Sequence, residues 1–187
     1  MKKLLYIVIA VVAVAAICLV FCGGSRATQS KTLVAYFSAT GNTAAVAERL
    51  ANATGADLFE IKPVAPYTAE DLDWRNDKSR TSIEMADRGS RPEIASRVEN
   101  MDQYDLVFVG FPIWWGREPS IIDTFIESYD FNGKTVVPFA TSGSTPTTDA
   151  AAESIHTIIP NVNVVTGARF PTDVSAEELK TWSEQWM

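Results

Sequence analysis

Apolar and polar positions follow two different periodicities along the chain and divide most of it into short strands and helices. Runs rich in β-branched and aromatic residues predict five strands, at Thr32–Phe37, Asp57–Ile61, Asp105–Gly110, Thr135–Thr141 and Asn161–Thr166. Between and after them, apolar residues recur at helical spacing in Thr43–Thr54, Ser120–Tyr129, Thr147–Ile159 and a last segment opened by the capping box Ser175-Ala-Glu-Glu178. Strands that alternate with helices pair in parallel, so the pattern predicts a doubly wound α/β sheet.

Two segments fit this pattern less well. The stretch Lys62–Arg97 is long, charged and interrupted by prolines, and we expect it to hold a helix around Ala69–Met85. An insertion of this length is either functional or a solvated surface excursion. In the fourth strand Pro138 argues against a central position, because proline cannot donate to a strand ladder.

The first residues have the layout of an export signal. Lys2 and Lys3 precede Leu4–Cys22, a run without a single charge that just reaches the length needed to span a bilayer. The positive-inside rule leaves the lysines in the cytoplasm and exports the rest of the chain. The chain is therefore divided into a signal peptide or membrane anchor, a linker and one folded domain, at residues 1–22, 23–31 and 32–187.

Three outcomes are open for the end of this apolar run. Leu19-Val20-Phe21-Cys22, followed by two glycines, resembles a bacterial lipobox, although Phe21 stands where that pattern has a small residue. Cys22 is thus a candidate for lipidation. The alternatives are cleavage at Ser25-Arg26-Ala27 and an uncleaved anchor. All three place the domain outside the cytoplasm, in the cell envelope or secreted.

Charge and cysteine content narrow the function. With 16 basic and 23 acidic residues among 187, the net charge of −7 disfavours a nucleic-acid binder and favours basic protein partners. Cys18 and Cys22 are the only cysteines, and both fall in the apolar run. Disulfide scaffolds, thiol nucleophiles and cysteine metal sites are therefore excluded for the domain, and a single histidine leaves little support for any metal.

In a parallel α/β sheet, ligands bind beyond the carboxyl ends of the strands, so the loops after strands one, three and four are the candidate site. The first loop, Ser38-Ala-Thr-Gly-Asn-Thr43, offers hydroxyls, an amide and the N-terminus of a helix, but no Lys or Arg. It matches neither GxxxxGK[ST] nor GxGxxG. Such a loop suits one terminal phosphate, or it is simply a helix cap with turn residues.

This loop carries a resemblance to a known family. A Ser/Thr-x-Thr-Gly-x-Thr pattern directly after the first strand is similar to the phosphate-binding loop of flavodoxins. The resemblance extends over nearly the whole domain. It implies FMN as the cofactor, a five-stranded sheet in the order 2-1-3-4-5, and phosphate-binding roles for the polar loop residues Ser38, Thr40, Gly41, Asn42 and Thr43.

The second loop contains two adjacent tryptophans, whose side chains cannot both point into one core. A planar aromatic ligand explains the pair, because stacking on a ring face contributes roughly 1–3 kcal/mol per ring. The alternative is that one tryptophan is a hydrophobic plug. The loop resembles the flavin-flanking segment of a subset of flavodoxin-like proteins, which implies ring contacts from Pro112, Ile113, Trp114, Trp115 and Gly116.

The third loop follows the fourth strand and is rich in small polar residues. It resembles the Thr-Ser-Gly-rich flavin loop of the same subset, with Ser144 where the common form has a second glycine. Small residues let the backbone approach a ring edge closely. The resemblance implies further cofactor contacts from Thr141, Ser142, Gly143 and Ser144.

These loops are shared by electron carriers and by FMN-dependent NAD(P)H or quinone-type oxidoreductases. We expect an electron carrier with a basic redox partner protein, attached to the membrane through its N-terminal segment. A reductase would need room for a second ligand, which Tyr67, Trp74 or Arg91 of the insertion could line. The phosphate loop contains no cation and the protein is acidic, so both disfavour the negatively charged reduced form of a bound flavin. We therefore also expect a low reduction potential for bound FMN.

Two hypotheses from other functional classes have less support. A serine hydrolase could use Ser142, His156 and either Asp123 or Asp149, but the G-x-S-x-G elbow is absent and His156 falls in a predicted helix. A non-catalytic scaffold domain on an anchor would leave the tryptophan pair unexplained.

Overall fold

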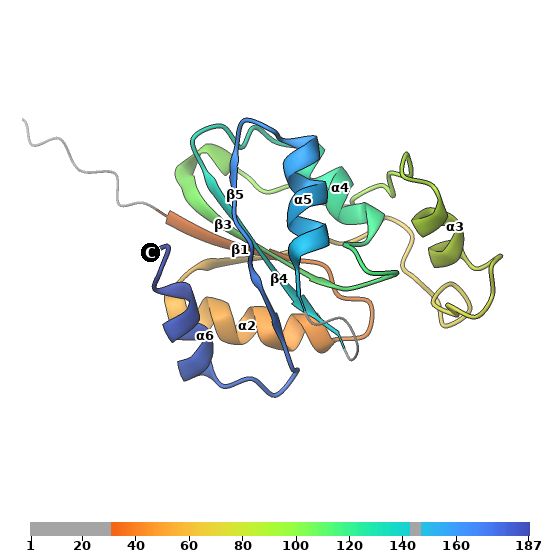
Figure 1. Ribbon diagram of the computed structural model, residues 1–187, viewed down its shortest axis with the longest axis horizontal. Helices are drawn as coiled ribbons and strands as arrows, with labels where there is room; N and C mark the ends of the chain where they lie inside the picture. The colour runs from red at the N-terminus through yellow and green to blue at the C-terminus, as the bar shows by residue number, and fades with distance from the viewer. Residues whose placement is uncertain (1–30, 143–146) are drawn as a thin grey trace, which may run out of the picture.

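A parallel β-sheet lies at the centre of the computed structural model, which describes residues 31–142 and 147–187 (Figure 1). The elements are, in chain order, β1 (Lys31–Tyr36), α2 (Asn42–Thr54), β2 (Asp57–Glu60), α3 (Arg80–Ala86), the short 3-10 helix η1 (Met101–Gln103), β3 (Tyr104–Pro112), α4 (Ser120–Glu127), β4 (Thr135–Thr141), α5 (Asp149–Ile158), β5 (Asn163–Val164), β6 (Ala168–Phe170) and α6 (Ala176–Ser183). The strands are ordered β2-β1-β3-β4-β5, which confirms the predicted fold class and order.

The sheet has one more strand than predicted, because its outer edge is broken. Beside β4 we expected one strand at 161–166, and the structure has two short ones. β5 pairs with the start of β4, and β6 pairs with its end. Between them Gly167 lies so close to β4 that a Cβ there would stand 1.5 Å from the carbonyl oxygen of Pro138.

This break also explains how Pro138 is accommodated inside a central strand, contrary to our expectation. Pro138 pairs with Val109 of β3 on one side of β4. In a β-strand, the backbone nitrogen and the carbonyl group of one residue point toward the same neighbouring strand. The carbonyl of Pro138 points toward Gly167. The missing N–H of Pro138 therefore points to the gap between β5 and β6, where no ladder bond is lost.

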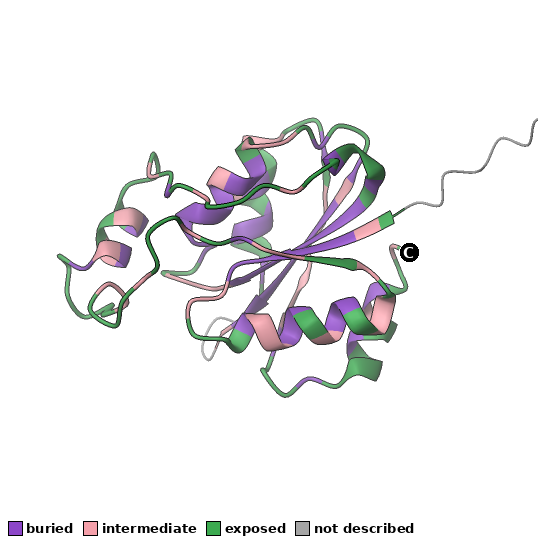
Figure 2. Cartoon of the chain, turned by 180° about the vertical axis from the view of Figure 1, so that it is seen from behind, coloured by how far each residue is buried: buried purple, intermediate pink, exposed green. Residues whose placement is uncertain are grey.

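Helices cover both faces of the sheet. α2 and α6 pack together on one face, and α4 and α5 pack together on the other (Figure 1). Each face has its own apolar core, with Val46 and Leu50 of α2 in one and Phe125 and Ile155 of α4 and α5 in the other. The central strands are buried along most of their length, whereas the helices are exposed on their outer sides (Figure 2).

The insertion between β2 and β3 contains a shorter helix than the expected Ala69–Met85. α3 begins only after Ser79, whose side chain caps it by accepting from the Ser82 N–H. In the preceding stretch, side chains of Thr68, Asp71 and Asp73 bond nearby backbone N–H groups, which stabilises turns in place of a helix. The segment around α3 extends outward from the sheet (Figure 1).

Parts of the prediction fall on residues that the structure does not describe. These are the signal or anchor segment with Cys22, and Gly143 and Ser144 of the third loop. Within residues 31–142 and 147–187, no helix is both long and apolar enough to cross a bilayer. The same residues contain no group of three or more His, Cys, Asp or Glu side chains arranged to hold a metal ion.

Candidate cofactor site

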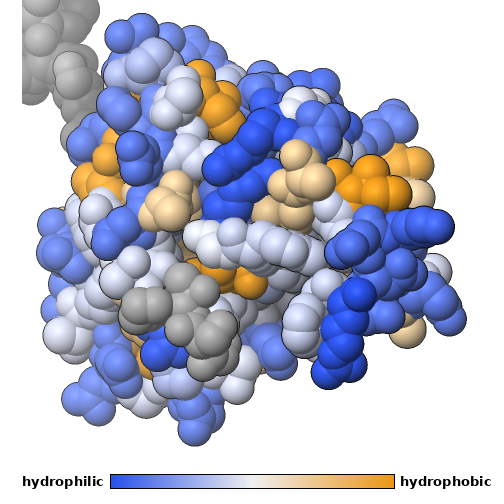
Figure 3. Space-filling view, turned by 45° about the vertical axis from the view of Figure 1, so that its right-hand side comes forward, coloured by the Kyte–Doolittle hydropathy of each residue, from blue (hydrophilic) through white to orange (hydrophobic). Residues whose placement is uncertain are grey.

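A cavity of about 1040 Å³ lies at the carboxyl ends of β1, β3 and β4. Its wall contains eight of the predicted site residues, namely Thr40, Asn42, Pro112, Ile113, Trp114, Trp115, Thr141 and Ser142. The insertion contributes Leu72, Trp74 and Thr81, and the chain at and after β6 contributes residues 169–172. In Figure 3, which brings the α3 side of the molecule forward, apolar surface occurs in small areas separated by hydrophilic side chains.

The loop between β1 and α2 is shaped to present backbone N–H groups. Gly41 is the N-cap of α2 with φ 87°, a left-handed conformation that favours glycine, and no side chain caps this helix. The Gly41 N–H donates to Ser38 Oγ at 3.1 Å, which closes the turn. The first N–H groups of a helix have no partner within it, so those of α2 can meet an anion.

Thr43 connects this loop to the end of β4. Its side chain is buried, and its Oγ1 lies 2.8 Å from Oγ1 of Thr141. This contact fixes the N-terminus of α2 against the strand that carries the third loop. The first and third predicted loops are thus brought together by a hydroxyl pair.

The tryptophan loop is a tight turn. Trp114 and Arg117 exchange two backbone hydrogen bonds of 2.9 and 3.0 Å, and the two residues between them have positive φ, 46° at Trp115 and 83° at Gly116. Two positive φ values in succession are typical of a type I′ turn. A bulky residue such as tryptophan rarely adopts this conformation, which is found mainly at functional sites.

The two tryptophans have different surroundings. Trp115 is 52% exposed at the tip of the turn. Trp114 packs edge-on against Phe37 and Tyr67, with centroid distances of 5.5 Å to each. Both also line the cavity. Trp114 therefore acts partly as the hydrophobic plug that we considered as an alternative, while Trp115 is exposed and lines the cavity.

A buried arginine holds the base of this turn. Arg117 is 5% exposed, and its guanidinium donates to the carbonyl of Glu118 at 3.1 Å and to the α3 carbonyl of Met85 at 3.5 Å. It also forms ion pairs of 3.5 Å with the carboxylates of Glu118 and Asp123. The insertion and α4 are thereby joined beneath the tryptophans.

Two carboxyl groups, those of Glu118 and Asp123, lie beside Arg117, and the pKa of one of them is raised. Burial, followed by the nearby charge of Glu118, raises the pKa of Asp123 to about 7. Glu118 Oε2 and Asp123 Oδ1 are both buried without a hydrogen-bond donor among the described residues. One proton on Asp123 relieves the repulsion between the two carboxylates.

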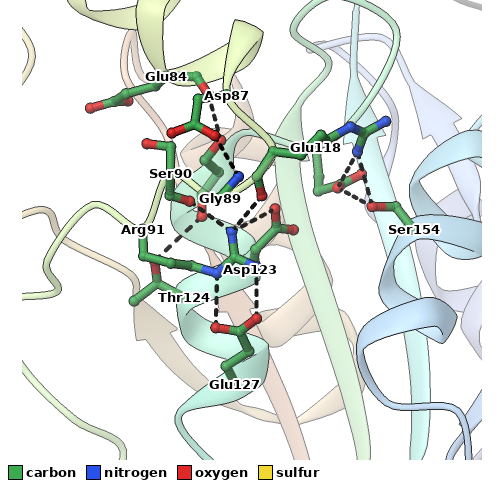
Figure 4. Close-up of polar contacts among 12 residues, drawn as sticks. Glu84, Asp87, Gly89, Ser90, Arg91, Glu118, Asp123, Thr124, Glu127 and Ser154 are labelled. Atoms are coloured by element: carbon green, nitrogen blue, oxygen red, sulfur yellow. Dashed lines mark hydrogen bonds and ion pairs between the residues drawn. The ribbon is translucent and has the colours of Figure 1, made fainter.

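Arg117, Glu118 and Asp123 form a buried ionic cluster. Side chains from α5 and from the insertion bond to its two carboxylates (Figure 4). Ser154 of α5 donates to Glu118 at 2.6 Å, and Arg88 pairs with the same carboxylate at 4.0 Å. Arg91 forms a two-pronged ion pair with Glu127, with distances of 2.8 and 2.7 Å, and approaches Asp123 at 3.8 Å. These contacts join Arg88 and Arg91 of the insertion to α4 and to Glu118, although most residues of the insertion are exposed.

Of the three insertion residues suggested for a second ligand, only Trp74 lines the cavity. Tyr67 is half-buried and donates to Glu84 at 2.6 Å, and burial followed by this bond raises the pKa of its hydroxyl. Arg91 is engaged by Glu127.

The hydrolase hypothesis has no assembled triad. Ser142 lines the cavity, whereas His156 is exposed on α5 and Asp123 belongs to the arginine cluster. Among the residues that the structure describes, His156 has no hydrogen bond to Ser142, Asp123 or Asp149, as a triad would require.

Comparison with known proteins identifies the family. A family model described as Flavodoxin matches residues 31–186. The chain belongs to the flavodoxin family. A search of curated proteins gave no match.

Among solved structures, this flavodoxin is similar to candidate flavoproteins from two Bacteroides species. The one from Bacteroides eggerthii is 47% identical with a TM-score of 0.79, and the match covers 84% of this chain and 98% of that one. The one from Bacteroides uniformis is 48% identical with a TM-score of 0.78, covering 83% and 98%. A flavoprotein from Lactobacillus acidophilus, solved in complex with FMN, is 25% identical with a TM-score of 0.61, covering 82% and 99%.

Sequence reasoning missed one charged residue of this flavodoxin site. Arg169 of β6 lines the cavity, and its guanidinium donates to the carbonyl oxygen of Ser142 at 2.8 Å. Residues 38–43 contain no Lys or Arg, but among the described residues of the cavity wall Arg169 supplies a cation. No local motif marks Arg169, because its position depends on the break after β5.

Proposed function

We propose that this flavodoxin binds FMN in the cavity, with the phosphate at the N-terminus of α2 and the flavin ring beside the tryptophan turn. One observation carries the proposal: a single cavity connects an uncapped helix N-terminus with two tryptophans. The FMN complex of the Lactobacillus acidophilus flavoprotein supports it. When bound, FMN supplies the redox chemistry, and the protein binds and tunes it.

The chemistry of the two ends fits this cofactor. Thr40 and Asn42 add polar side chains to the free N–H groups of α2, as a phosphate requires. Pro112, Ile113 and Trp114 form an apolar wall at the other end, where a planar ring can exclude water. The volume of about 1040 Å³ is just above the range of roughly 300–1,000 Å³ typical of ligand pockets.

Flavin binding by the purified full-length chain tests the proposal. We expect FMN to be bound with quenched fluorescence, and riboflavin, which lacks the phosphate, to bind about 10–100-fold more weakly. Thr40→Val should reduce this preference, whereas the matched control Thr157→Val, on the surface of α5, should not. Absence of FMN binding, or equal binding of riboflavin, would contradict it.

For the biological role we propose electron transfer to or from a basic protein. The net charge of −7 favours association with basic partners, and such association slows as salt screens the charges. The rate of reduction by a basic reductase should therefore fall with ionic strength. If the FMN-loaded protein oxidises NAD(P)H without any added reductase, the oxidoreductase alternative replaces the carrier.

Export and membrane attachment through residues 1–22 are the last part of the proposal. The support is the sequence Leu4–Cys22 alone, with its preceding lysines. We expect the chain in the membrane fraction of the cell envelope. A lipid-sized mass increase on Cys22 that Cys22→Ser abolishes would identify the lipoprotein outcome, and an unmodified full-length chain would identify the uncleaved anchor. Recovery of the intact chain in the cytoplasm would refute export.

A further inference from the structure

Arg169 and the N-terminus of α2 belong to opposite faces of the sheet. Residues paired across neighbouring parallel strands point to the same face, and Arg169 pairs with Ala140 of β4. Ala140 packs in the core on the α4 and α5 face, the face on which Trp114 also packs. Thr141, the next residue, points to the other face and contacts Thr43 of α2. Arg169 is thus on the side of the tryptophan turn.

The guanidinium of Arg169 is only partly satisfied. One nitrogen donates to the carbonyl of Ser142, but Nε is buried and has no acceptor among residues 31–142 and 147–187. Within the same residues, Arg91 and Arg117 pair with carboxylates, whereas Arg169 has no carboxylate partner. A buried N–H without an acceptor is costly, and such groups are found where a ligand completes the bonding.

We propose that Arg169 stabilises the negative charge of the reduced FMN ring and so sets the reduction potential of the bound cofactor. This inference rests on the proposed function, in which FMN occupies the cavity with its phosphate at α2. Uptake of two electrons and one proton leaves one negative charge on the flavin ring. A guanidinium next to that charge favours the reduced form over the neutral oxidised form.

This role opposes the low potential expected from the phosphate loop. Residues 38–43 contain no cation, and the chain is acidic, so both disfavour an added negative charge. Arg169 lines the same cavity and lies on the sheet face of the tryptophan turn, beside which the proposal places the flavin ring and its added charge. A fixed guanidinium within a cavity wall is also less screened by salt than a surface charge is.

Substitution of Arg169 in the full-length, FMN-loaded protein tests the inference. The variants are R169Q and R169M, which remove the charge, and R169K, which keeps it. R97Q is the matched control, because Arg97 also donates to a backbone carbonyl at 2.8 Å, that of Ser128, but is exposed. Potentials are measured by anaerobic reductive titration against a reference dye, and affinities for oxidised FMN and riboflavin by fluorescence.

We expect R169Q and R169M to weaken binding of the reduced cofactor about tenfold relative to the oxidised one, a decrease of about 30 mV for a two-electron couple. R169K should stay near the wild-type potential, and R97Q should equal it. An unchanged potential in both neutral variants would overturn the inference. So would a selective loss of preference for FMN over riboflavin, which would make Arg169 a phosphate ligand.

The proposed function and this inference fail in different ways. Failure of the wild-type chain to bind FMN refutes the proposed function. Binding of FMN with a potential that does not depend on the charge at position 169 refutes only the role of Arg169. A thermal melt of each variant separates loss of charge from loss of folding, and R169M keeps much of the aliphatic packing if R169Q is unstable.

Discussion

The two ends of the cavity are held in place by different interactions. At the α2 end, the loop is fixed by neutral groups, the turn closed by Ser38 and the hydroxyl pair of Thr43 and Thr141. At the tryptophan end, the turn is fixed by a buried ionic cluster around Arg117 and Asp123. Neutral hydrogen bonds do not change between pH 5 and 8, whereas a buried carboxyl pair does. Only one end of the site is therefore expected to be sensitive to pH.

The same difference determines how much stability is lost when one interaction at either end of the cavity is removed. Removing one hydroxyl of a pair costs a single hydrogen bond, about 1 kcal/mol. Removing the cation from a buried ionic cluster leaves uncompensated charge, which costs several times more. The tryptophan turn is held on one side by Trp114, which packs against Phe37 and Tyr67, whereas Trp115 is exposed and adopts positive φ. Arg117 holds the other side through its ion pairs with Glu118 and Asp123.

Replacement of Arg117 should produce the largest effect. Arg117→Met removes the cation shared by Glu118 and Asp123, so we expect a loss of about 3–5 kcal/mol in the free energy of unfolding at pH 7. Urea unfolding monitored by tryptophan fluorescence and by circular dichroism measures it. The control is Arg97→Met, an exposed arginine that should change stability by less than about 1 kcal/mol. Equal effects of the two substitutions would show that the cluster does not support the turn.

The pH dependence of stability should show the second largest effect. Burial and Glu118 raise the pKa of Asp123 to about 7, above its value in the unfolded chain, so the folded state binds a proton that the unfolded state has lost. The contribution is complete below about pH 4 and is lost as the pH rises through 7. Between pH 5 and 7, the free energy of unfolding of the wild type should fall by about 2 kcal/mol relative to Asp123→Asn.

Two variants test the origin of this pH dependence. Asp123→Asn is neutral at every pH and should lack the decrease. Glu118→Gln removes the charge that raises the Asp123 pKa, so the decrease should move to lower pH. Parallel pH profiles for the wild type and Asp123→Asn would mean that Asp123 is ionised throughout. The measurement is urea unfolding at a series of pH values and constant ionic strength.

The two ends also differ in how far the sequence predicts them. The α2 end follows from local signals, because an apolar strand, a polar loop with Gly41 and a helix are consecutive in the chain. The adjacent tryptophans were also recognisable, since two large rings in succession cannot share one core. Residues from both loops line the cavity.

The charged elements were not predictable, because their burial depends on distant segments. Arg117, Glu118 and Asp123 resemble an ordinary surface helix start until the insertion packs over them. Arg169 lies opposite Ala140 because the strand beside β4 is broken at Gly167 and a second strand, β6, begins opposite Phe139. Side-chain hydrogen bonds that stabilise turns also shortened the helix expected in the insertion.

The smallest effect is expected at the neutral end of the cavity. Thr43→Val removes the hydroxyl pair with Thr141, and we expect a loss of about 1 kcal/mol in the free energy of unfolding, equal at pH 5 and pH 8. Thr157→Val is the control, because that threonine bonds only the carbonyl of Glu153 on an exposed part of α5. Urea unfolding at both pH values measures the change. A loss that grows with pH would show that the α2 end is coupled to the carboxyl pair, and the two ends of the cavity would then have to be treated as one unit.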